Sequence, residues 1–252
     1  LPPDFEKYLR KQDIDHTFNA LHTWIEYVNR LLGALLGVFA IIQVLLIAGK
    51  RKLMPAAWKL ALSFLFIVIL TGVFGAIVVK LNLAHLSISV HLLFAIILLL
   101  VQLALLLTVS GKQDAIPVSN NIRKLLYAFI VVMLIQSVMG TMVRMYVDDI
   151  SKVLHYEQRE QWLAETPIAF LMHRSFSWVV LLMVVYIAWA GRLQSEVKNK
   201  LYLLAAIIFL SVVTGITLYY ANMPAVAQPL HLLLASLAIT QATSVLIQAK
   251  RK

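Results

Sequence analysis

Long apolar runs separated by short polar segments dominate the chain. Seven of them have the length that crosses a bilayer as a helix, about 20 residues. Charged residues, proline, asparagine or glycine bound the runs, which cover residues 24–48, 59–79, 86–109, 124–145, 167–190, 201–221 and 229–249. The pattern predicts an all-α polytopic membrane protein with seven transmembrane helices.

Composition excludes an ordinary soluble domain. The 252 residues are 61% hydrophobic and 13% charged, whereas soluble proteins have about 45–50% apolar and about 25% charged residues. The absence of cysteine excludes disulfides, thiolate metal ligands and cysteine nucleophiles for these residues. A net charge of +10 would favour nucleic-acid binding in a soluble protein, but basic residues of membrane proteins gather in the loops on one side. We therefore expect contact with membrane lipid and none with nucleic acid.

The basic residues alternate between the two ends of the spans. Only two of the 12 acidic residues, Asp114 and Glu196, accompany the thirteen basic residues of the second, fourth and sixth polar segments and the C-terminus. These thirteen are Lys50, Arg51, Lys52, Lys59, Lys112, Arg123, Lys124, Arg192, Lys198, Lys200, Lys250, Arg251 and Lys252. The positive-inside rule then places the N-terminus outside and the C-terminus in the cytoplasm.

The domain organisation follows from this topology. We expect an outer-side segment at 1–23, an N-terminal half-bundle at 24–110, a cytoplasmic linker at 111–123 and a C-terminal half-bundle at 124–252. The chain begins at Leu1 without a signal-like segment, and an outside N-terminus needs something to carry it across. We therefore expect a further helix before residue 1, which makes eight in the full chain.

The first three spans repeat as the last three. Asn29-Arg30 in the first span falls on His173-Arg174 in the fifth, and His91 in the third falls on His231 in the seventh. Between them, Leu70-Thr71-Gly72 aligns with Val213-Thr214-Gly215. Four spans separate the copies, an even number, so both copies have the same orientation in the membrane. We expect two pseudo-symmetric four-helix bundles.

The repeat places Asn29, His91, His173 and His231 at one depth, near the outer ends of their helices. Ionisable residues within spans are costly and usually face a bundle interior, a pathway or a cofactor. Paired histidines without a carboxylate or thiolate suit the axial positions of a heme better than a zinc or di-iron site. For a single histidine the alternative is a hydrogen bond between helices. The matching depth favours heme for His173 and His231.

Charged residues accompany these positions. Arg30, Arg174 and Arg144 lie on the same outer side, where they can bind heme propionates or place their charges in the interface. Glu26 lies three residues before Asn29, on the same helix face. Its carboxylate can steer a substrate or transfer a proton, or it is a solvated acid at a helix start.

Five short motifs together resemble the heme A synthase family of bacterial and mitochondrial inner membranes, over nearly the whole chain. They are Glu26-Tyr-Val-Asn29-Arg30-Leu-Leu-Gly, His91-Leu-Leu-Phe-Ala, Gly140-Thr141-Met-Val-Arg144, His173-Arg174 and Gln228-Pro-Leu-His231-Leu-Leu-Leu-Ala. The resemblance implies eight helices in two similar halves, with heme b bound by His173 and His231. It also implies that the N-terminal half oxidises heme O, whose C8 methyl becomes the formyl group of heme A.

By the same resemblance, Glu26 is the functional glutamate of the N-terminal half and His91 is its second histidine. The chain departs from the family at Asn29, where members usually have a histidine. His91 would then be the one strong axial ligand of a substrate heme, leaving the other face to a weak ligand, water or O2. The same departure suits a paralogue that has lost the reaction.

Three functions therefore stay open: a membrane oxidase that converts heme O to heme A, a diheme b-type electron carrier, and a non-catalytic heme-handling or oxidase-assembly factor. Paired strong ligands at both sites are typical of an electron carrier, and Asn29 breaks that pattern. The resemblance implies heme O synthase and cytochrome oxidase assembly factors as partners and the bacterial inner membrane as the location. A homo-oligomer is left open.

Overall fold

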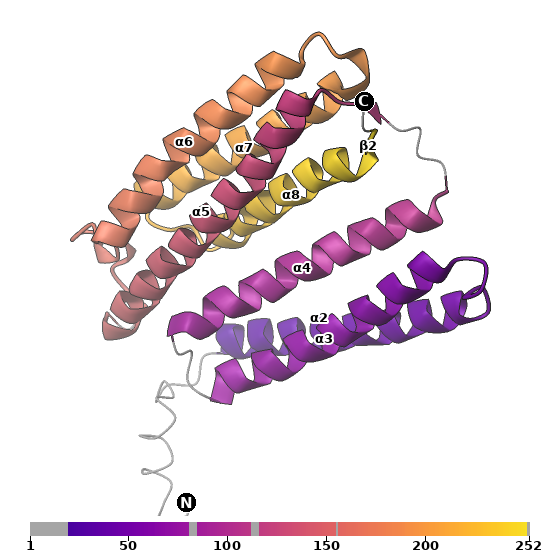
Figure 1. Ribbon diagram of the computed structural model, residues 1–252. Coiled ribbons are helices and arrows are strands. Elements are labelled where there is room, and N and C mark those ends of the chain that lie inside the picture. The colour runs from indigo at the N-terminus through magenta and orange to yellow at the C-terminus, as the bar shows by residue number, and fades with distance from the viewer. Residues whose placement is uncertain (1–19, 81–84, 112–115, 155, 251–252) are drawn as a thin grey trace, which may run out of the picture. The chain divides into compact units, whose positions relative to one another are not determined.

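The computed structural model describes residues 20–80, 85–111, 116–154 and 156–250. Most of the predicted outer-side segment and part of the predicted linker lie outside these residues. In the described part, seven helices are long and apolar enough to cross a membrane, which confirms the predicted class (Figure 1). They are α2 (Ala20–Ala48), α3 (Pro55–Lys80), α4 (His85–Val109), α5 (Asn120–Val153), α6 (Ile168–Gly191), α7 (Ser195–Tyr220) and α8 (Ala227–Gln248).

The apolar surface of these helices fits a lipid surrounding. A helix satisfies its backbone hydrogen bonds internally, which a membrane-spanning segment requires. Large apolar side chains are exposed on every helix, for example Leu46 of α2 at 73% and Leu182 of α6 at 66%. Water would penalise this exposure, whereas lipid tails do not.

Helix α5 is longer than the predicted span at both ends. Its first turn begins at Asn120, where the hydroxyl of Ser119 lies 3.5 Å from the backbone nitrogen of Ile122. Its last two turns continue past the apolar run to Val153. An ion pair of 2.7 Å between Arg144 and Asp148, four residues apart, supports that polar extension. The apolar pattern misses it because hydropathy does not register local ion pairs.

The chain divides after Val109 into two compact units. Unit 1 contains α2, α3 and α4, with α3 packed against both other helices (Figure 1). Buried alanines, such as Ala40 of α2 and Ala57 of α3, line these contacts, because small side chains let helices approach closely. The amide of Gln43 on α2 donates to Gln102 on α4 at 3.2 Å, a polar link between two apolar helices.

Unit 2 is a four-helix bundle in which α5 packs on α6 and α8, and α7 packs on the same two helices. Side-chain amides link elements at the end where the chain turns from α6 to α7: Gln194 contacts Ser119 at 3.2 Å, and Gln241 donates to the carbonyl of Lys200 at 3.0 Å. At the same end, the two-residue strands β1 (Ile116–Pro117) and β2 (Ala249–Lys250) pair in parallel.

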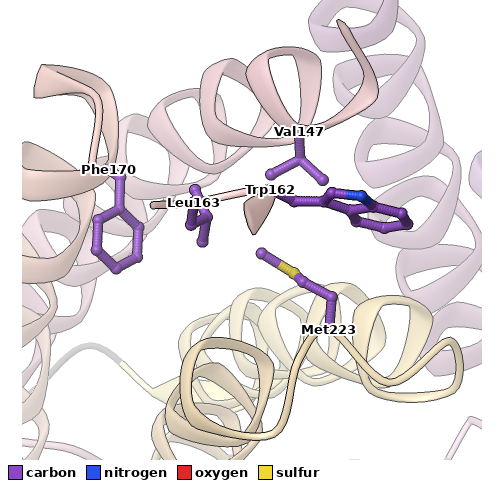
Figure 2. Close-up of a cluster of buried hydrophobic side chains, with 5 residues drawn as sticks. All are labelled: Val147, Trp162, Leu163, Phe170 and Met223. Atoms are coloured by element: carbon purple, nitrogen blue, oxygen red, sulfur yellow. The ribbon is translucent and has the colours of Figure 1, made fainter. Parts of the chain in front are cut away.

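A cluster of buried side chains, which we call the cap, closes the other end of unit 2. Its members come from α5, the α5–α6 connection, α6 and the α7–α8 turn: Val147, Trp162, Leu163, Phe170 and Met223 (Figure 2). The connection contains a short 3-10 helix, Arg159–Gln161. The guanidinium of Arg159 donates to the carbonyl of Met223 at 3.1 Å, and the indole nitrogen of Trp162 donates to the carbonyl of Glu157 at 2.9 Å. The cap thus ties the α5–α6 connection to the α7–α8 turn.

Candidate functional site

Three histidine rings lie on α4, α6 and α8, and each packs against a glycine of the helix that precedes it in the chain. The pairs are His91 with Gly75, His173 with Gly140 and His231 with Gly215. A Cβ atom added at these glycines would lie 3.2, 3.1 and 3.2 Å from the ring Cε1, closer than ordinary van der Waals contact. Glycine therefore lets each ring lie directly against a neighbouring helix backbone. The shared setting agrees with the internal repeat.

The glycine contacts correct one part of the repeat. The interval from Gly75 to Gly215 is 140 residues, the same as the interval from His91 to His231. A Cβ added at Gly72 would meet nothing within 4 Å. The predicted alignment of Gly72 with Gly215 is therefore wrong by three residues. Both segments are almost uniformly apolar, and a shift of three residues is close to one helical turn, so the hydropathy pattern alone does not fix this register.

The rings of His173 and His231 lie close together within unit 2, one edge-on to the other. Their ring centroids lie 6.2 Å apart and the ring planes make an angle of 76°. Imidazole nitrogens bind a metal ion at about 2 Å, and each nitrogen lies about 1 Å from its ring centroid, so two rings on opposite sides of one ion have centroids about 6 Å apart. The observed separation matches that value. Two imidazoles from two helices therefore stand as far apart as two axial ligands of one iron.

The surroundings of His231 select the form of the imidazole that binds metals. Its Nδ1 lies 2.8 Å from the backbone carbonyl of Ser211 and 3.1 Å from the hydroxyl of Thr214. A carbonyl only accepts, so Nδ1 carries the hydrogen and Nε2 keeps its lone pair. Metal-ligating histidines commonly donate their second N–H to a carbonyl, which fixes the tautomer and the ring orientation.

The other two histidines are less completely paired. The Nδ1 atoms of His173 and His91 are buried and have no hydrogen-bond partner within the described part of the chain. The backbone carbonyl of His173 accepts a hydrogen bond of 3.0 Å from the amide of Gln136 on α5. At the position that Thr214 occupies in unit 2, unit 1 has Phe74, whose ring packs edge-on against Phe94.

The predicted residues of α2 form a separate, exposed group. Glu26 and Arg30 pair with each other one turn apart, and both side chains are more than half exposed. Asn29 is exposed and lines a shallow hollow with Trp24 and Val28. Among the residues that the structure describes, Asn29 has no hydrogen bond, and Nδ1 of His91 has no hydrogen-bond partner. The expected grouping of Asn29 with His91 around one iron therefore stays a prediction.

The two predicted arginines of unit 2 have partners within the protein. Arg144 binds Asp148 at 2.7 Å and the side-chain amide oxygen of Gln228 on α8, so it links α5 to α8. The guanidinium of Arg174 lies 5.6 Å from the ring centroid of Phe170, a cap residue. Both arginines are near the cap end of the bundle, the end to which His173 is also close.

The side chains around His173 and His231 that could act as metal ligands limit which kind of metal centre fits there. In the described ranges, no group of three or more histidine, cysteine, aspartate or glutamate side chains could hold a metal ion. A protein-ligated zinc or di-iron centre needs such a group, whereas heme iron takes four ligands from its own macrocycle and one or two from the protein. The two imidazoles, their spacing and the tautomer of His231 fit a heme.

Sequence reasoning missed three features of this site: Gln136, the Ser211 carbonyl, and the contacts made by the glycines. Gln136 is a polar residue in the middle of an apolar span, which is a usable signal for an interior position. The Ser211 carbonyl carries no such signal because every residue has one. The glycines were visible, but only the register of the packed helices shows which of them meets a histidine.

The family model described as cytochrome oxidase assembly protein, COX15-CtaA, matches residues 2–243. No curated protein and no solved structure matches the chain.

Proposed function

Because the chain belongs to the COX15-CtaA family of cytochrome oxidase assembly proteins, the heme A synthase family, we propose that it is an oxidoreductase that converts heme O to heme A. The methyl group at C8 of the substrate would be oxidised by four electrons to a formyl group, with O2 as the proposed oxidant and source of the formyl oxygen. Heme b in unit 2 is the resident cofactor, and heme O is the substrate in unit 1.

The imidazole pair carries this proposal. His173 and His231, from α6 and α8, have ring centroids 6.2 Å apart, and these two imidazoles would hold the heme. Such a heme supplies one-electron transfer. Within unit 2, the Ser211 carbonyl holds His231 with Nε2 available, and the cap residue Phe170 lies one turn before His173 in α6. Phe170 is buried and stacks on Tyr219 with ring centroids 5.0 Å apart.

In unit 1, His91 is the proposed ligand of the substrate heme. Its ring is held against Gly75, and a buried Nδ1 leaves Nε2 as the nitrogen open to a ligand. The exposed face of α2 that carries Glu26 and Asn29 provides the rest of the substrate site. Glu26 is the proposed proton-transfer group, and Arg30, its partner in an ion pair, binds a propionate when the substrate enters.

A second candidate is a heme-binding paralogue or b-type electron carrier without the oxidation. The observation that favours it is the position of Asn29, exposed and without a hydrogen bond to His91 in the described residues. An amide is a poor ligand for heme iron, so this site would then hold heme weakly or not at all.

Pigment analysis distinguishes these functions. The full-length protein is expressed with a source of heme O, and its pigments are extracted and identified by pyridine hemochrome spectra and mass. Heme A together with heme B supports the oxidase, and heme B with unoxidised heme O supports the second candidate. Glu26→Ala serves as the matched variant: we expect it to keep heme B and lose heme A, because it removes the acid–base group and leaves the imidazole pair unchanged.

The charge pattern and the resemblance also support a location in the bacterial inner membrane, with both heme sites toward the outer face. Heme O synthase is the proposed source of substrate, and assembly factors of the oxidase are the proposed recipients of heme A.

A further inference from the structure

The residue that precedes the glycine under each histidine ring differs among the three sites. It is Phe74 at the His91 site, Met139 at the His173 site and Thr214 at the His231 site. The backbone setting is the same in all three, because a Cβ added at the glycines would lie 3.1 to 3.2 Å from the ring Cε1 and 3.6 to 3.7 Å from Nδ1. Of the three preceding residues, threonine alone has a hydroxyl. A hydroxyl at this position therefore distinguishes the His231 site.

Three oxygen atoms surround Nδ1 of His231. The Ser211 carbonyl lies at 2.8 Å, the Thr214 hydroxyl at 3.1 Å and the Ser211 hydroxyl at 3.4 Å. The carbonyl has a counterpart at the other imidazole, where the backbone carbonyl of Gln136 faces Nδ1 of His173, also from four residues before the glycine. The Thr214 hydroxyl has no counterpart there, because a methionine occupies its position. The two imidazoles of the pair thus differ in the groups around Nδ1.

The Ser211 carbonyl determines which way the hydroxyl of Thr214 is used. A carbonyl only accepts, so Nδ1 of His231 carries the hydrogen, and the Thr214 oxygen beside it is an acceptor. The hydroxyl donates its own hydrogen to the Ser211 carbonyl, 2.8 Å away. A chain therefore runs from Nδ1–H through the Thr214 hydroxyl to the Ser211 carbonyl, beside the direct bond to that carbonyl. Hydrogen bonds in such a chain polarise one another, which makes a donating hydroxyl a better acceptor.

We propose that Thr214 is a positioning residue for the axial ligand His231: its hydroxyl accepts a share of the Nδ1–H hydrogen bond while Nε2 binds iron. The inference rests on the proposed heme b site and deepens it. A hydrogen bond at the second nitrogen fixes the ring orientation and raises the basicity of the nitrogen that binds the metal. A more basic imidazole favours ferric over ferrous iron. The Thr214 hydroxyl therefore lowers the reduction potential of heme b.

The experiment compares reduction potentials of heme b in the purified full-length protein by redox titration. Thr214→Val removes the hydroxyl and keeps the branched shape. We expect the preference for ferric iron to fall about threefold, less than for a sole outer partner because the Ser211 carbonyl remains. At about 59 mV per tenfold change for a one-electron couple, the potential rises by about 28 mV. Thr214→Ser keeps the hydroxyl and should keep the parent's potential. Thr217→Val is the matched control, because that hydroxyl donates to the Val213 carbonyl of its own helix at 2.9 Å.

The outcomes separate this inference from the proposed function. A potential in Thr214→Val that equals that of Thr217→Val overturns the role of Thr214 and leaves the heme site intact. If Thr214→Val does not retain heme, Thr214→Ala decides by the same comparison. Loss of heme in both variants supports the inference if Thr214→Ser retains heme at the parent's potential, and overturns it if Thr214→Ser also loses heme. Parent protein that carries no low-spin heme dependent on His231 overturns the proposed heme site itself.

Discussion

The contact between Gly140 and His173 makes a quantitative prediction. In Gly140→Ala the new methyl would lie 3.1 Å from the ring Cε1, so the ring must move by a few tenths of an ångström. Overpacking of this kind costs about 1–3 kcal/mol, and the better helix propensity of alanine returns about 1 kcal/mol. We expect a net loss of about 0–2 kcal/mol in the free energy of unfolding. The imidazole should also tilt away from its ligating position.

The assay reads both effects on the same sample. Absorption and electron paramagnetic resonance spectra of the purified protein report the low-spin fraction of the heme and the orientation of its axial imidazoles. A thermal melt in detergent reports stability. In Gly140→Ala we expect a reduced low-spin fraction or shifted resonance values, with only a small change in the melting temperature.

Two other glycines supply the controls. Gly72→Ala adds a methyl where nothing lies within 4 Å, so it should change neither the heme spectrum nor stability except for a small gain. Gly191→Ala places a methyl 2.2 Å from Leu201 Cδ1, far along α6 from His173, and should destabilise unit 2 while the bound heme keeps its spectrum. Resonance values in Gly140→Ala identical to those of Gly72→Ala would refute the role of this contact.

Three further changes test other parts of the molecule. His173→Ala or His231→Ala should abolish the low-spin heme b spectrum, and its survival in either variant would remove that ligand assignment. Asn29→His should convert the unit 1 heme to a six-coordinate, low-spin form, which absorption spectra detect; an unchanged spectrum would mean that residue 29 does not face the iron. Trp162→Ala should lower the free energy of unfolding by about 3–5 kcal/mol, because the side chain is buried in the cap. A denaturant titration that shows a loss of less than about 1 kcal/mol would contradict the importance of the cap.

The C-terminal end of α5 depended on an interaction that hydropathy does not register. The last two turns of α5 are polar enough to end an apolar run, yet the helix continues because Arg144 pairs with Asp148 along its surface. The alignment of the α3 sequence with the α7 sequence in the internal repeat was likewise not determined by the apolar pattern. Gly72 and Gly75 stand in equally apolar surroundings, and only the packing of α3 on α4 shows that Gly75 meets His91.

The seven helices of the described residues and the positions of the histidines could be predicted from the sequence, because a lipid surrounding demands long apolar runs and makes each ionisable residue within them conspicuous. The sequence also determined the repeat that relates His91 to His231. The contacts between side chains came from the folded structure alone: the 6.2 Å approach of His173 and His231, the glycine under each ring, and the Ser211 carbonyl that sets the tautomer of His231. Those contacts join residues on different helices, and the rotation and register of packed helices are set by side-chain shape, which apolar periodicity does not encode.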